Sequence, residues 1–175
     1  MRSFIMIVIT SLFLVSVLGC NNTINEVTDQ MIDEVIREHN LDVIDVKKTS
    51  QGAVFIFFVN KKQIGAYTLY MDEHHQLVKG MNGLVSESTE DINLAENKAL
   101  LAGYLDGAVG LMINDDQLLN QATYCKVFMD GEFQKELLMD NQERTYIIEL
   151  ESFVRSKHQV VSVKFFDSND NEIHL

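Results

Sequence analysis

Short runs of β-branched, aromatic and aliphatic residues alternate with turn-forming residues through most of this sequence after residue 40. Runs of this length and spacing predict antiparallel strands joined by tight turns. Asp130-Gly131 is the clearest hairpin signal, because Asp and Gly tolerate the left-handed backbone of a two-residue turn. The chain is therefore expected to fold around antiparallel sheets. The predicted strands are 41–46, 53–59, 64–71, 76–79, 123–129, 133–138, 145–150, 159–166 and 172–175.

One amphipathic helix is expected before the strands. Thr23 and Glu26 have the spacing of a capping box, which predicts a helix start at Thr23. Apolar residues then recur on one face up to Ile36, and His39-Asn40 is expected to end the helix, because Asn tolerates the left-handed conformation. The predicted fold class is α+β, with this N-terminal helix on an antiparallel meander, followed by a small antiparallel module resembling a β-sandwich.

A polar, turn-prone stretch divides the mature chain. We predict an α+β module at 23–80, a linker or long surface loop at 81–98 and a β-rich module at 99–175. The β-rich module begins with an apolar segment, 99–113, that contains three glycines. A hairpin turning at Asp106-Gly107 is favoured there, while a buried helix stays open. The next eight residues, Asn114 to Gln121, are expected to form a short capped helix or a turn.

The order of elements in each module is similar to that of a known family. The first module resembles PepSY-type modules of secreted bacterial proteins, and the second resembles, in outline, immunoglobulin-like envelope modules. Both resemblances concern element order alone, since the chain has no Trp and lacks the cysteine pair of true immunoglobulin domains. The first implies a regulator or inhibitor of an extracellular enzyme as one function to consider.

The first twenty residues have the layout of a secretory signal. A short positive start, Met1 to Ser3, is followed by an apolar run from Phe4 to Leu18. These fifteen residues are fewer than the roughly 20 that a helix needs to span a bilayer. The run therefore predicts a segment that is cleaved off, and it ends in Val17-Leu18-Gly19-Cys20.

Those last four residues resemble the lipobox of bacterial lipoproteins. The resemblance implies cleavage between Gly19 and Cys20, removal of 1–19 and attachment of acyl chains to the Cys20 sulfur. Leu18 stands where the family more often has a smaller or β-branched residue. Because each buried methylene adds about 0.8 kcal/mol, two or three acyl chains hold firmly. The resemblance thus implies a lipoprotein of the Gram-positive type on the extracytoplasmic face of the cell membrane, with 20–22 as a lipidated tether.

Composition limits the partners of the mature chain. Its net charge of −12 becomes −13 when Arg2 leaves with the signal segment, which makes nucleic acid and anionic headgroups poor partners.

With Cys20 acylated, Cys125 has no partner for a disulfide. The chain has no proline, so an exposed edge strand would have to be protected by charge. The candidates for that protection are Lys126, Lys135 and Lys164.

Short segments with potential ligands or reactive groups each have a structural interpretation. His74-His75 fall in a predicted hairpin turn, where neighbouring imidazoles on a strand would point apart. Residues 167–172 begin like a calcium loop, but Glu172 stands where Gly is needed. Asn114-Asp115-Asp116 suits a helix cap. Phe55 to Phe58 suits a strand buried on both faces, and Cys125 suits a small buried hydrophobe.

The sequence contains no nucleophile elbow, no phosphate-binding glycine loop and no metal-ligand spacing. We therefore predict a non-enzymatic lipoprotein with no catalytic residue, no metal ligand and no cofactor. Its partners are expected to be the lipid bilayer, through Cys20, and another envelope protein or peptide. Two alternatives stay open: a regulator or inhibitor of an extracellular enzyme, and an enzyme or solute-binding protein whose site is assembled from distant residues.

Overall fold

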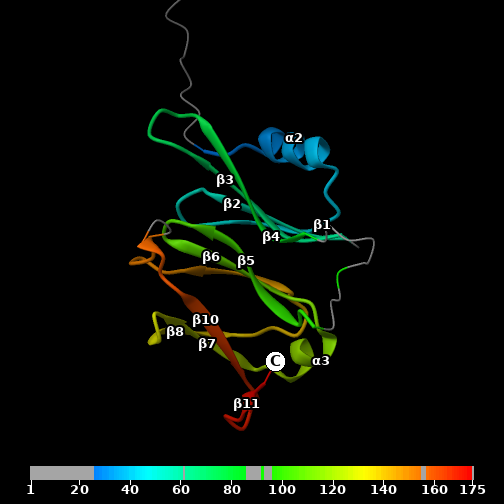
Figure 1. The fold of residues 1–175 in the computed structure, drawn as a ribbon, viewed down its shortest axis with the longest axis vertical. Coiled ribbons are helices and arrows are strands. Elements are labelled where there is room, and N and C mark those ends of the chain that lie inside the picture. Colours follow the sequence, from blue (N-terminus) through cyan, green and yellow to red (C-terminus); the bar gives the residue numbers. More distant parts are fainter. Residues whose placement is uncertain (1–25, 61, 86–91, 93–95, 155–156, 175) are drawn as a thin grey trace, which may run out of the picture.

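The computed structural model describes residues 26–60, 62–85, 92, 96–154 and 157–174 (Figure 1). Its helices are α2 (Asp29–His39) and α3 (Asp116–Gln121). The strands are β1 (Val43–Lys48), β2 (Val54–Val59), β3 (Gln63–Met71), β4 (Leu77–Val85), β5 (Ala99–Leu105), β6 (Ala108–Ile113), β7 (Tyr124–Met129), β8 (Glu132–Leu138), β9 (Thr145–Glu149), β10 (Val161–Phe166) and β11 (Glu172–Ile173).

The strands form three antiparallel sheets, which stack in layers together with α2 (Figure 1). Sheet A has the order β1-β2-β3-β4, sheet B β5-β6-β9 and sheet C β11-β10-β7-β8. Sheet A carries α2 on one face and packs on sheet B with the other, and sheet B packs in turn on sheet C. The outer face of sheet C therefore lies at the opposite end of the stack from α2 (Figure 1).

Helix α2 begins later than the capping-box pattern predicts. Its N-cap is Thr28, whose hydroxyl accepts a hydrogen bond from the Met31 backbone N–H at 3.4 Å. Glu26 precedes the helix, and Thr23 lies outside the described residues. The predicted end is confirmed, because Asn40 is the C-cap and takes a left-handed φ of 47°. On the face of sheet A that α2 covers, Ile32 and Val35 of the helix pack on Val54, Ile56 and Leu69.

Two phenylalanines and two glycines shape the core between sheets A and B. Phe55 and Phe57 of β2 are fully buried in this core. Gly103 of β5 and Gly110 of β6 are opposite each other. A Cβ atom would lie only 2.9 Å from the Phe55 ring at Gly103 and 3.0 Å from it at Gly110. The glycines of 99–113 therefore make room for aromatic rings, and the segment is a hairpin rather than a helix.

The predicted fold class, α+β, is wrong. Antiparallel strands make up about half of the described residues, and the helices α2 and α3 are both short. Sheet B is covered by sheet A as well as by sheet C, so three sheets stack in layers in place of a meander followed by a small sandwich. The physical reason lies in β6, whose six residues are all buried and need cover on both faces.

The predicted division into modules stays a prediction. Strand β4 continues to Val85, so the first residues of the expected linker, 81–98, belong to sheet A. Residues from both sides of that segment share one core, in which Phe55 and Phe57 pack with Ala102 and Met112. The expected signal segment, 1–19, and the tether, 20–22, lie outside the described residues.

Candidate functional site

One face of sheet C points away from the rest of the molecule and carries aromatic side chains. Successive residues of a strand point to opposite faces of its sheet. The residues of β7 that are buried against sheet B are Cys125, Val127 and Met129. The residues between them therefore point outward. We call the outward residues of β7, β8 and β10 the aromatic face; its large side chains are Tyr124, Lys126, Phe128, Phe133, Leu138 and Phe166.

The strand register arranges the aromatic face in three rows. They run across β10, β7 and β8 as Phe166–Tyr124–Leu138, Lys164–Lys126–Glu136 and Ser162–Phe128–Phe133. A charged row therefore lies between two rows that are rich in apolar side chains. Side chains that are opposite each other on neighbouring strands interact directly. A partner bound to this face would therefore contact the side chains of a row together.

The first row is held rigid by its own contacts. The rings of Tyr124 and Phe166 are stacked, with centroids 5.1 Å apart and an interplanar angle of 6°. The Lys126 Nζ lies 4.6 Å from the Phe166 centroid, within range of a cation–π interaction. The Tyr124 hydroxyl donates a hydrogen bond to Asp170 at 2.8 Å. That hydrogen bond, aided by burial, raises the pKa of Tyr124 to about 12.

The third row exposes apolar surface. Phe128 and Phe133 meet edge to face with centroids 6.1 Å apart. Phe133 remains 56% exposed and Leu138, at the end of the first row, 79%. Val160, beside the β7–β8 turn, is 65% exposed and exchanges backbone and side-chain hydrogen bonds with Asp130. Exposed apolar side chains on one face of a sheet are typical of interaction surfaces.

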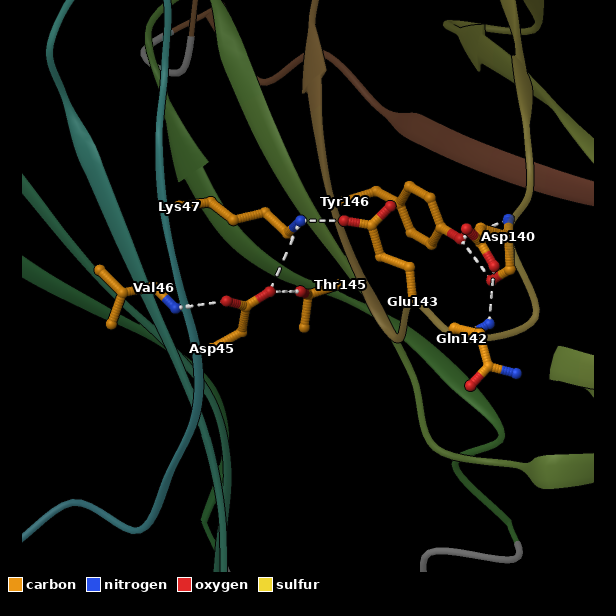
Figure 2. A network of polar contacts seen from close by, with 8 residues as sticks. All are labelled: Asp45, Val46, Lys47, Asp140, Gln142, Glu143, Thr145 and Tyr146. Carbon is orange, nitrogen blue, oxygen red and sulfur yellow. Dashed lines mark hydrogen bonds and ion pairs between the residues drawn. The ribbon is translucent and has the colours of Figure 1, made fainter.

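A second candidate lies where β1 meets the start of β9. Figure 2 shows Lys47 and Asp45 of β1 pointing toward Glu143 and Thr145. Lys47 donates a hydrogen bond to Glu143, and the Thr145 hydroxyl donates one to Asp45. Beside this network is a cavity of about 500 Å³, lined by Ile44, Asp45, Asp140 and residues 142–145. The charged groups of the network are bonded to one another, so we interpret the network as a polar contact that holds sheets A and B together.

The charge on Lys47 is stabilised by its neighbours. Burial alone would lower the pKa of Lys47, but the hydrogen bond to Glu143 and the negative charges of Asp45 and Glu143 outweigh it, and the pKa is raised. A lysine that serves as a nucleophile or base needs a lowered pKa instead. Lys47 is therefore suited to holding the two sheets together.

Lys47→Met is expected to lower the free energy of unfolding by about 1 kcal/mol, since it removes two ionic contacts and leaves Asp45 and Glu143 without their cation. Because folding raises the Lys47 pKa, this contribution is complete below the pKa of the unfolded chain and is lost as the pH rises through the folded value. Urea denaturation at pH 7 and above pH 10.5 measures both effects.

The neighbouring lysine supplies the control for this experiment. Lys48 contacts Asp29 at 3.2 Å, but their side chains are 50% and 91% exposed. Lys48→Met should therefore leave stability nearly unchanged. Two results would contradict the role of Lys47 in holding the sheets together. One is an equal loss of unfolding free energy in the two variants, and the other is a loss in Lys47→Met that grows with pH.

The histidine and calcium-like segments are turns in the structure. His74 and His75 lie between β3 and β4, where the Asp72 carboxylate accepts hydrogen bonds from the backbone N–H groups of His74 and Gln76. In the segment 167–172, the Asp167 carboxylate accepts from the backbone N–H groups of Asn169 and Asn171. Both segments thus close hairpins, as the sequence predicts. Within the described residues, no group of three His, Cys, Asp or Glu side chains could hold a metal ion.

The remaining candidates also have structural positions. Asp115 is the N-cap of α3 and accepts from the Leu118 backbone N–H at 2.6 Å, which confirms the predicted cap. Strand β2 is buried on both faces, as predicted for Phe55 to Phe58. Cys125 is fully buried, and burial raises the pKa of its thiol to about 12, so it is not a reactive thiolate.

The predicted lipidation site cannot be placed on this fold, because Gly19 and Cys20 lie outside the described residues. No helix in the described part of the chain has the length and apolar character that crossing a membrane requires. Comparison with known proteins adds no relative: no family model matches the chain, and no curated protein or solved structure is significantly similar to it.

The sequence predictions missed the aromatic face. A signal was present in β7, where apolar residues occupy both alternating sets of positions instead of one. Such a strand is either covered on both faces or exposes an apolar surface. The three lysines expected to guard an edge also lie differently: Lys126 and Lys164 are on inner strands of sheet C, and only Lys135 is on an edge strand.

Proposed function

We propose that this protein is a non-enzymatic binding protein, anchored to the extracytoplasmic face of the cell membrane by acyl chains on Cys20, which receives another envelope protein or peptide on the aromatic face. The observation that carries this proposal is the exposure of Phe133 and Leu138 on a sheet face whose other rings are paired, one pair stacked and one edge to face. Preformed apolar anchors beside polar groups are what protein interfaces use for most of their binding energy.

The position of the aromatic face supports the proposal. The described chain begins at Glu26, near α2, and sheet C forms the opposite end of the stack (Figure 1). Between Cys20 and Glu26 the chain can reach at most about 20 Å. The end of the molecule that carries α2 is therefore tied to the membrane surface, and the aromatic face lies at the end that is free to meet a partner.

The proposal is tested by capture from detergent-solubilised membranes with tagged full-length protein. Replacing both exposed side chains, Phe133→Ser with Leu138→Ser, is expected to reduce recovery of a specific partner by about tenfold, because these anchors are lost while the core is untouched. The matched control is Tyr70→Ser with Leu84→Ser, which removes two exposed apolar side chains from sheet A. Repeated failure to recover a specific partner, or equal recovery with both variants, would count against the proposal.

A further inference from the structure

The outer edge of β8 has backbone groups that are free to pair. At the start of the β7–β8 ladder, the Met139 backbone N–H donates to the Thr123 carbonyl at 2.9 Å. Bonded and non-bonded pairs alternate along an antiparallel ladder. Leu137 and Lys135 therefore direct their backbone groups toward β7, whereas Glu136 and Leu138 direct theirs outward. Among the described residues, no strand of the sheet pairs with this edge.

This edge is only partly protected. Proteins commonly protect an exposed edge strand with proline, a bulge, lysines along the edge or a charged residue that points inward. The chain has no proline, and the bulge between Val127 and Phe128 disturbs only the end of β8 near the turn. Lys135 is the only lysine of β8, and its Nζ donates to the Glu149 carbonyl of β9 at 3.3 Å. Lys135 is therefore an inward-pointing charge, and neither a proline nor a bulge interrupts the backbone edge from Lys135 to Leu138.

The rows of the aromatic face specify what an added strand should carry. Its residue beside Leu138 would extend the row of Phe166 and Tyr124, where an apolar side chain fits best. Its residue beside Glu136 would meet a carboxylate, which favours Lys or Arg. Two residues further along, it would pass Gln134, the extra residue of the bulge, beside the exposed Phe133 ring, where an apolar side chain again fits. Alternate residues of one strand meet these three rows.

The charge around the edge favours the same kind of segment. The acidic residues on β8 and at its two ends are Asp130, Glu132, Glu136 and Asp140, against one lysine that is already bonded to β9. The whole chain carries a net charge of −12, which would attract a basic segment and repel an acidic one.

We propose that β8 accepts an extended peptide segment as a further strand of sheet C, and that this segment has the pattern apolar, any, basic, any, apolar. This inference rests on the proposed function and specifies the kind of partner that the aromatic face receives. Backbone hydrogen bonds to Glu136 and Leu138 would supply affinity, and the three rows would supply selectivity.

The test uses full-length protein in detergent micelles and fluorescent peptides of about eight residues. One peptide alternates Thr with Ile, Lys and Ile; a second has Glu in place of Lys; a third keeps the first sequence but is N-methylated on the backbone groups that would face β8. We expect the Lys peptide to bind about tenfold more tightly than either of the others. Glu136→Lys is expected to reverse the preference between the Lys and Glu peptides.

A proline variant separates strand addition from side-chain docking. Leu138→Pro removes an outward N–H that no ladder bond uses, so the variant should fold with little change in stability. It is expected to bind the Lys peptide at least about tenfold more weakly than Leu138→Ala, which lacks the same side chain but keeps the N–H. Unfolding curves for both variants check that the fold persists.

Several results would overturn the inference. Equal binding of the N-methylated peptide, or equal binding by Leu138→Pro and Leu138→Ala, would mean that partners dock without adding a strand. Absence of peptide binding would overturn it as well, and so would a dimer of this protein that Leu138→Pro dissolves, because the occupant would then be a second copy. The proposed function fails separately, if partner capture is insensitive to Phe133 and Leu138.

Discussion

A Cys20→Ala chain is expected to incorporate no labelled fatty acid, and either to be released into the medium or to stay unprocessed with its apolar segment, 4–18, still attached. The lipobox resemblance makes the Cys20 sulfur the point of acylation, so without that sulfur no acyl chain is attached there. Growth with a clickable fatty acid, followed by fractionation, measures both outcomes.

The second cysteine gives a matched control for that experiment. Cys125 is fully buried in the core between sheets B and C, so it is inaccessible to acylation in the folded protein. Cys125→Ala should therefore keep full labelling and full membrane retention. Normal labelling of Cys20→Ala would refute the anchor and remove the membrane part of the proposed function.

Gly65→Ala is expected to lower the free energy of unfolding by about 4 kcal/mol or more, which would leave little folded protein. Gly65 on β3 and Gly83 on β4 are opposite each other. A Cβ atom at Gly65 would lie 2.2 Å from the Asn82 carbonyl oxygen and 2.8 Å from the Gly83 Cα. Both are backbone atoms, so no side-chain rotation relieves the overlap and the two strands must separate. Chemical denaturation followed by circular dichroism measures the loss.

A second glycine distinguishes this contact from backbone strain. Gly107 has a φ of 77° in the β5–β6 turn, and no heavy atom lies within 4 Å of the position that its Cβ would take. Gly107→Ala should therefore lower the free energy of unfolding by about 1 kcal/mol, because the positive φ alone is unfavourable for Ala. A Gly65→Ala loss no greater than that of Gly107→Ala would show that β3 and β4 are not so closely paired.

Most individual elements could be predicted from the sequence, because they depend on local patterns. The Asp130-Gly131 turn, the end of α2 at Asn40 and the Asp115 cap all follow from what one or two residues prefer. The start of α2 could not be predicted as well, since Thr28 competes with Thr23 as a cap and both are followed by helix-forming residues.

The arrangement of the sheets could not be predicted, because it depends on contacts between distant residues. Gly103 and Gly110 look unfavourable for any strand until Phe55 is placed against them. Strand β6 needs cover on both faces, and only sheets A and C together provide it. A sequence considered one segment at a time gives no sign that the two halves share this central layer, so it predicts too large a role for the helix.

The aromatic face was missed for a related reason. The pattern of β7 shows that both of its faces are apolar, but not which of them is covered. Tyr124 and Phe128 could equally have packed under another layer. Only the position of sheet C at the end of the stack leaves their face open (Figure 1). The site therefore follows from the order of the layers, which local patterns do not contain.

The most direct measurement is site-specific photo-crosslinking in intact cells that produce the protein. A photoreactive amino acid is placed at Leu138, on the aromatic face, or at Asp33, which is exposed on α2 at the other end of the stack. We expect a discrete crosslinked partner from position 138 and none from position 33. No crosslink at 138, or the same products from both positions, would contradict the assignment of the aromatic face as the binding surface.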